Sequence, residues 1–290
     1  MSWTTFCCPV CKGPLEATTA RLRCASCGRD YEIVDGIPDF FVSAAQEERI
    51  DDPNKTWLDP IIVQARDTAY RLCAHELKGM AFCMQEISRR TSAGCRILEV
   101  GMGTGHFTRW MAEAAKPGTE IYAFDFSWPI IEKARANTRG LSGVMLFRAN
   151  ARAQLPFEDE GFDILFLRLA PLGAHGTPRV RAAFELLKPG GWYFEAGWEP
   201  TRYETPPTEW ALQHGYENAE YHVWQYYRRQ TEQEVVAMQV ERECLISMGC
   251  ESVGAVQVRE SDAPNHEGQD GSVLNMTCER FLVAQKPGSG

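Results

Sequence analysis

Three glycines at alternating positions, Gly101, Gly103 and Gly105, are the residues best placed to bind a ligand through the backbone. They follow a short apolar run that contains an acid, Glu99, and they precede a helix-like stretch that begins at His106. Glycine has no Cβ, so a strand-to-helix turn made of glycines lets a ligand approach the main chain closely. The dinucleotide-binding spacing Gly-x-Gly-x-x-Gly requires a small residue at position 106, so this turn is predicted to serve a different ligand.

A second acid, Asp125, ends the next apolar run, residues 120–125. It lies about 20 residues after the glycines, where a carboxylate can accept hydrogen bonds from both ribose hydroxyls of a nucleoside. Together with the glycine turn, Asp125 indicates a nucleoside-binding site.

Four cysteines near the N-terminus have the spacing of a metal site: Cys8 and Cys11 form one Cys-x-x-Cys pair, and Cys24 and Cys27 form another. Four thiolates can surround Zn²⁺ tetrahedrally, and a closed site of that kind is structural rather than catalytic. A segment of this size cannot bury enough core alone, so a metal would hold it together. A disulfide pair and unrelated cysteines are the alternatives. Cys7 could compete as a ligand, but the matching spacing favours Cys8.

The stretch from 93 to 199 alternates between strand-like and helix-like patterns, which predicts a parallel sheet covered on both faces. Residues 127–135 begin a helix in this stretch, with Pro129 in the first turn, where its missing N–H costs little. Residues 252–260 and 273–284 flank a polar turn and predict a final antiparallel strand pair.

Three further landmarks follow in order: residues 148–157 contain Leu-Pro-Phe, residues 161–166 begin Gly-Phe-Asp, and residues 186–192 contain Leu-Lys-Pro-Gly-Gly. With the glycine turn, this series resembles the class I S-adenosylmethionine (SAM) methyltransferases of the type 11-like group. The resemblance implies an α/β fold with a doubly wound, seven-stranded Rossmann-like core, and SAM as the cofactor. The cysteine segment resembles a zinc ribbon, and a ribbon ahead of such a core is similar in layout to the 23S rRNA guanine-N1 methyltransferases.

The resemblance also implies a role for each residue at the expected cofactor site. Glu99 would meet the amino group of the methionine part, Asp125 would hold the ribose, and Phe126 would pack on the adenine. Asn150 and Ala151 would contact the adenine edge, and Asn150 stands where the family often has Asp. The whole expected cofactor-binding set is Glu99, Gly101, Met102, Gly103, Gly105, Asp125, Phe126, Asn150 and Ala151.

Three domains are expected: a zinc ribbon over 1–42, a helical lid or linker over 43–92, and a SAM methyltransferase domain over 93–290. An aromatic-rich insertion at 200–230 follows the fifth strand of the core, where it is expected to cover the active site. A substrate pocket lined by aromatic side chains suits a planar or apolar substrate. An amphipathic helix or a homodimer contact is the alternative interpretation of this insertion.

A general base, if the reaction uses one, is expected among His175, His214 and His222. Imidazole titrates near neutral pH and can accept a proton, although each residue is more simply explained as a surface or packing histidine. Residues 169–172 lack the Asn/Asp-Pro-Pro-Tyr motif of many amino-targeting nucleic-acid methyltransferases, which argues against methylation of an exocyclic amine of DNA. The Ala-Pro pair in this segment resembles the guanine-N1 methyltransferases instead.

The 290-residue chain has a formal net charge of −9, which makes it a poor generic binder of phosphate backbones. We therefore expect a small-molecule acceptor that is aromatic or apolar. The alternatives are an rRNA guanine-N1 acceptor, a metalloid acceptor bound by scattered thiols, and a non-catalytic SAM- and zinc-binding scaffold. No apolar run approaches about 18 residues, and the N-terminus lacks signal-peptide features. A cytoplasmic protein with no membrane contact is expected, where thiols stay reduced.

Overall fold

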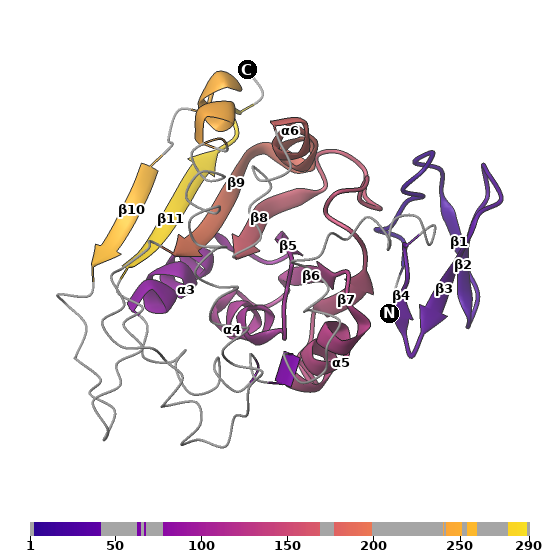
Figure 1. Cartoon of the computed structure of the whole chain (residues 1–290). Coiled ribbons are helices and arrows are strands. Elements are labelled where there is room, and N and C mark those ends of the chain that lie inside the picture. The colour runs from indigo at the N-terminus through magenta and orange to yellow at the C-terminus, as the bar shows by residue number, and fades with distance from the viewer. Residues whose placement is uncertain are drawn as a thin grey trace.

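The computed structural model folds the chain into two sheets, one with four strands and one with seven (Figure 1). No helix in the described ranges is long and apolar enough to cross a membrane. The described residues are 3–41, 63–64, 67, 78–168, 177–198, 240, 242–250, 254–259 and 278–288.

The larger sheet is built from β5 (Arg96–Val100), β6 (Glu120–Asp125), β7 (Val144–Arg148), β8 (Phe162–Arg168), β9 (Leu187–Trp198), β10 (Gly254–Arg259) and β11 (Cys278–Gln285). Its strand order is β10-β11-β9-β8-β5-β6-β7. The strands from β5 to β9 are parallel, whereas β11 pairs antiparallel with both β9 and β10. This topology confirms the expected doubly wound, seven-stranded α/β core. The winding reverses at β5, where such sheets bind ligands.

The helices beside this sheet are α3 (Lys78–Arg90), α4 (His106–Ala114), α5 (Trp128–Asn137) and α6 (Thr177–Glu185). Apolar side chains of α3, α4 and α5 form one core with residues of the sheet, and side chains of α6 join a second core. Helices therefore cover both faces, as the alternating pattern predicts (Figure 1). Pro129 occupies the first turn of α5, as expected.

Strand β5 shows how the sheet presents one acid to a helix. Leu98 and Val100 belong to one core, while Ile97 belongs to the other, with α4. Successive side chains of a strand point to opposite faces. Glu99 therefore shares the face of Ile97 and lies beneath α4.

The smaller sheet is a ribbon of antiparallel strands, β1 (Leu15–Ala17), β2 (Arg21–Cys24), β3 (Asp30–Val34) and β4 (Ile37–Pro38). Strands β3 and β4 are joined at Asp35 and Gly36, whose φ angles of 50° and 80° are both positive. An Asp-Gly pair favours this two-residue turn because both central residues need a left-handed backbone. We use the word ribbon for residues 3–41.

Aromatic side chains of the ribbon enter the core of the larger sheet. The ring of Phe6 lies 5.2 to 5.9 Å from the rings of Phe157, Phe147 and Tyr122. Phe40 also lies against Phe147, with 6.1 Å between ring centroids. The size of this segment predicts that a metal holds it together, whereas the structure adds a shared hydrophobic core.

Main-chain contacts extend this docking to the edge strand β7. The N–H of Phe40 donates to the carbonyl of Arg148 (2.9 Å), and Asp39 forms an isolated parallel bridge with Arg148. The N–H of Cys7 donates to the carbonyl of Pro156 (2.9 Å). Figure 1 shows β4 beside β7. The ribbon thus packs against the end of the strand that neighbours β6.

Candidate functional site

The glycine turn joins β5 to α4 with a left-handed backbone at all three glycines. The φ angle is 71° at Gly101, 53° at Gly103 and 79° at Gly105, a region that residues with a Cβ rarely adopt. The N–H of Met102 donates to the carbonyl of Phe124 (2.9 Å), which ties the turn to the end of β6. The glycines seen in the sequence therefore supply the conformation that the turn needs.

Gly103 and Gly105 have different surroundings. A Cβ on Gly105 would lie 2.8 Å from the Cα of Ala134, so glycine permits the turn to pack on α5. A Cβ on Gly103 would meet no atom within 4 Å. Gly103 thus borders open space next to the carboxyl ends of β5 and β6, where a ligand can reach the backbone.

Asp125 lies at the end of β6 and faces the glycine turn. Its Oδ2 accepts a hydrogen bond from the N–H of Gly103 (3.2 Å), and its Oδ1 accepts from the N–H groups of Phe126 (2.8 Å) and Ser127 (3.3 Å). Asp125 as a whole is 7% exposed. These bonds fix the carboxylate between the glycine turn and the segment that leads into α5.

Glu99 is buried beneath α4, with 1% of its surface exposed. The hydroxyl of Thr108 donates to its Oε2 (2.6 Å), while Oε1 has no hydrogen-bond partner among the described residues. Burial raises the pKa of Glu99 to about 8, with a further contribution from the nearby Asp125 included and the opposing hydrogen bond from Thr108 deducted. A buried carboxyl with one unpartnered oxygen is suited to meet a cationic group.

Glu99 should make the free protein less stable as pH rises. Its pKa is about 8 in the folded protein against an ordinary value of 4.5, so between these values the folded state holds a proton that the unfolded chain has released. The contribution of this proton to the free energy of unfolding is complete below the ordinary pKa. It falls as pH rises and levels off above the folded pKa. The Gln side chain in Glu99→Gln is neutral at every pH, so the free energy of unfolding should fall less with pH in this variant than in the wild type. Urea unfolding between the two pKa values measures this difference.

The control for this experiment is Glu113→Gln, because Glu113 is an exposed acid on α4, the helix that covers Glu99. This variant should retain the wild-type decline. An equal decline in Glu99→Gln and wild type would show that folding does not raise the pKa of Glu99.

The residues expected to meet adenine lie close to Asp125 in the structure. Phe126, Asn150 and Ala151 are half-buried, and the N–H of Ala149 donates to the carbonyl of Asp125 (3.1 Å). Oδ1 of Asn150 accepts from the N–H of Arg152 (2.9 Å), which holds its side chain in a local turn. The segment after β7 is therefore positioned next to the end of β6.

His106, the first residue of α4, belongs to a buried polar network. Its Nε2 lies 3.0 Å from Oδ1 of Asp67, and Nδ2 of Asn137 donates to the same oxygen (2.6 Å). Nδ2 of Asn137 also donates to the carbonyl of Thr104 (2.8 Å). Residue 67 is thereby tied to the glycine turn and to α5. Asp67 could not be recognised from the sequence, because no local pattern separates it from other acids.

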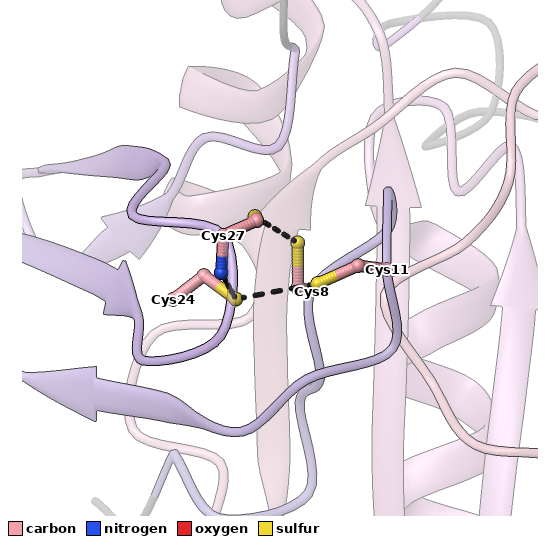
Figure 2. A group of neighbouring side chains, drawn as sticks. All are labelled: Cys8, Cys11, Cys24 and Cys27. Atoms are coloured by element: carbon pink, nitrogen blue, oxygen red, sulfur yellow. Dashed lines mark hydrogen bonds between the residues drawn. The ribbon is translucent and has the colours of Figure 1, made fainter.

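The four cysteines of the two Cys-x-x-Cys pairs converge in the ribbon (Figure 2). Their sulfur atoms all lie within 4.8 Å of one another, with 3.7 Å between Cys8 and Cys27 and 3.5 Å between Cys11 and Cys24. A tetrahedral ion with metal–sulfur bonds of about 2.3 Å needs sulfurs about 3.8 Å apart. The group therefore has the dimensions of a four-thiolate metal site.

Two neighbouring residues define this group further. The hydroxyl of Tyr31 lies 3.0 Å from the sulfur of Cys8 and can donate a hydrogen bond to it. Cys7 is outside the group, and burial raises the pKa of its thiol to about 11. The spacing argument that favours Cys8 over Cys7 agrees with this arrangement.

Comparison with known proteins assigns families to both parts of the chain. Residues 97–191 match the family described as a methyltransferase domain, and residues 5–36 match the family of Trm112p-like proteins. The chain carries a methyltransferase domain. The resemblance to SAM-dependent methyltransferases drawn from the glycine turn is confirmed, and the Trm112p-like segment coincides with the cysteine ribbon.

Individual relatives match only part of the chain. Malonyl-[acyl-carrier protein] O-methyltransferase from Methylococcus capsulatus is 28% identical over 150 residues, covering 49% of this chain and 51% of that protein. Demethylmenaquinone methyltransferase from Geobacillus kaustophilus is 32% identical over 115 residues, covering 37% and 47%. The chain thus spans about half the length of the curated relatives it matches.

Among solved structures, a SAM-dependent methyltransferase from Aquifex aeolicus is similar, with a TM-score of 0.46 and 16% identity. The alignment covers 84% of this chain and 98% of that one.

The residues expected on the acceptor side fall outside the described part of the chain. His175, His214 and His222 all lie there, as does the aromatic-rich insertion at 200–230. The Ala-Pro pair within 169–172 also lies there. The structure therefore brings together the residues expected at the cofactor and at the metal, and it leaves the three histidines untested.

Proposed function

We propose that this protein transfers a methyl group from SAM to a small-molecule acceptor. The observation that carries the proposal is the pairing of Asp125 with Gly103 at the ends of β6 and β5. The carboxylate is fixed by backbone N–H groups, and the glycine beside it borders open space. A nucleoside placed there would meet both the acid and the exposed backbone.

The residues around this pair fit the other parts of SAM. The unpartnered oxygen of Glu99 is a suitable acceptor for the ammonium of the methionine part, and Gly101 and Met102 would border that part through the backbone. Phe126, Asn150 and Ala151 would surround the adenine. SAM supplies a methyl group that its sulfonium already activates, so the protein has to align the acceptor and exclude water.

Alanine substitutions should separate folding from cofactor approach at two glycines. Gly105→Ala should lose about 2 kcal/mol or more of stability, because the methyl group meets the backbone of α5. Gly103→Ala should lose about 1 kcal/mol, from its positive φ alone. It should nevertheless bind SAM at least about tenfold more weakly, a change of about 1.4 kcal/mol, because its methyl group fills the open space. Urea unfolding and calorimetric titration measure the two effects, and normal SAM affinity in Gly103→Ala would contradict this placement.

Zn²⁺ is the proposed ion of the ribbon, held by Cys8, Cys11, Cys24 and Cys27. The sulfur spacing supports a tetrahedral site, and four protein ligands leave no open position for a substrate. The metal would therefore be structural. The proposed domains are a zinc-ribbon domain over 1–42, which includes the ribbon, a helical lid or linker over 43–92, and the methyltransferase domain over 93–290.

The charge of the chain supports a small acceptor. The net charge is −9, and two arginines on the outer face of the ribbon, Arg21 and Arg23, both lie near Asp30 (3.4 and 3.9 Å). Basic side chains that already have acidic neighbours are poor anchors for phosphates. The names of the two relatives refer to malonyl-[acyl-carrier protein] and demethylmenaquinone rather than to a nucleic acid. We propose an aromatic or apolar acceptor, with any general base among His175, His214 and His222.

Methyl-labelled SAM tests this function in two steps. Calorimetry first measures binding of SAM and of its demethylated product. The protein is then incubated with labelled SAM and either apolar aromatic small molecules or rRNA at low and high salt. Label in a small molecule supports the proposal. Label in rRNA with a steep salt dependence would establish the RNA alternative, and binding without transfer to either class would favour the scaffold.

A further inference from the structure

The side chain of Arg148 connects the ribbon to the segment that follows Asp125. Its Nη1 donates to Oδ2 of Asp39 in the ribbon (3.0 Å), and its Nε donates to the carbonyl of Phe126 (2.8 Å). The Arg148 side chain is 10% exposed and that of Asp39 is 17% exposed. One largely buried guanidinium therefore bonds to both parts of the molecule.

The peptide that joins Phe126 to Ser127 is held at both ends. Its carbonyl accepts the bond from Arg148, and its N–H, which belongs to Ser127, lies 3.3 Å from Oδ1 of Asp125. The peptide is planar, so fixing its carbonyl also fixes the direction of its N–H. Arg148 thereby influences the groups that orient the Asp125 carboxylate.

The ribbon in turn holds Arg148 in place. Oδ1 of Asp39 accepts from the N–H of Phe41 (2.9 Å), and the ring of Phe41 lies 4.2 Å from the guanidinium. The ring of Trp128, the first residue of α5, lies 5.4 Å from the guanidinium. A planar guanidinium can donate in two directions while stacking on aromatic faces, which lysine cannot do.

From these contacts we infer that Asp39 and Arg148 are positioning residues for the cofactor, through which the folded ribbon orders residues 126–128 beside Asp125. The inference rests on the proposed function, because it assigns the nucleoside of SAM to this segment. Neither residue touches the reacting atoms. Their effect should appear in cofactor affinity and in the order of one segment.

A second ion pair between the ribbon and the larger domain provides a matched control. Nη1 of Arg135 lies 3.1 Å from Oδ2 of Asp35, and both side chains are largely exposed. This pair also joins the ribbon to α5, but within the described part of the chain neither residue bonds to the carbonyl of Phe126 or to Asp125. Asp35→Asn should leave cofactor binding unchanged, because exposed pairs contribute little.

The test compares Asp39→Asn, Arg148→Lys and Asp35→Asn in the full-length, metal-loaded protein. Affinity for the demethylated product of SAM is measured by calorimetry, and amide hydrogen exchange is measured at residues 126–128. Asp39→Asn and Arg148→Lys should weaken binding at least about fivefold, the lower range of coupling between linked sites. Both should also accelerate exchange at 126–128, while metal content stays at the wild-type level.

Two results would overturn the inference. One is unchanged affinity in Asp39→Asn and Arg148→Lys, even if their thermal stability falls, because the pair would then be structural only. The other is unchanged exchange at 126–128. The exchange measurement needs no cofactor, so it remains decisive if the wild-type protein fails to bind SAM, a failure that would count against the proposed function instead. If Asp39→Asn does not fold, Arg148→Lys carries the same comparison.

Discussion

Replacing Cys24 by serine is expected to remove the metal and to destabilise the larger domain along with the ribbon. Structural zinc contributes about 10–16 kcal/mol of binding free energy in small zinc-finger peptides. The rings of Phe6 and Phe40 would leave the shared core when the ribbon unfolds, exposing Phe147 and Tyr122. A loss of even about 5 kcal/mol would lower Tm by about 10 °C or more, at about 2–4 °C per kcal/mol. Metal analysis and a thermal scan measure both effects.

Cys7→Ala is the matched control for this prediction, because Cys7 is an adjacent buried thiol outside the sulfur group. It should keep one metal ion per chain and lose about 1 kcal/mol, as expected for a small buried truncation. Loss of metal in Cys7→Ala and its retention in Cys24→Ser would show that the ligand set is wrong. Metal loss without a change in Tm would show that the ribbon does not support the core.

Asp125→Ala is expected to weaken SAM binding by about 100-fold. Hydrogen bonds to a charged group contribute about 1.5–3 kcal/mol each, and the proposed contact with ribose contains two. Each 1.4 kcal/mol is tenfold in affinity. Asp125→Asn retains one acceptor oxygen and should lie between the wild type and Asp125→Ala. Calorimetric titration with SAM distinguishes the three proteins.

Loss of Asp125 also leaves the N–H groups of Gly103 and Phe126 without their acceptor, so stability has to be measured beside affinity. Asp163→Ala is the control, because Asp163 in β8 accepts from the N–H of Arg96 (2.8 Å) and pairs with Lys188. Arg96 begins β5, so this acid lies away from the carboxyl ends of the strands. Its removal should lower stability and leave SAM affinity unchanged. Equal affinity losses in the two variants would point to general loosening rather than a lost contact.

Much of the cofactor site could be predicted from the sequence, because its determinants are local. The glycine turn, the strand at 120–125 and the acid at its end are neighbours in the chain, and their spacing encodes the turn that follows each strand. The four cysteines could also be predicted, because the spacing within each Cys-x-x-Cys pair places its two sulfur atoms close together. Cys8 could be separated from Cys7 by spacing alone for this reason.

The docking of the ribbon could not be predicted in this way. Asp39 and Arg148 are 109 positions apart. Hydrophobic periodicity indicates which face of a strand is buried, but it does not indicate which segment packs against the edge of the sheet. The partnership of Asp67 with His106 was missed for the same reason. Both are polar contacts between distant segments, where each residue alone has an ordinary local context.

The distance along the chain between the ribbon and its docking strand has a consequence during synthesis. When Phe6 and Phe40 emerge from the ribosome, Phe147 has not yet been synthesised. The nascent ribbon therefore has no apolar surface of the larger domain to pack against. Contacts of such long range also slow folding, because a large loop must close before they form. Until that closure, the proposed ion bound by the four thiols is what can keep the emerging segment from aggregating.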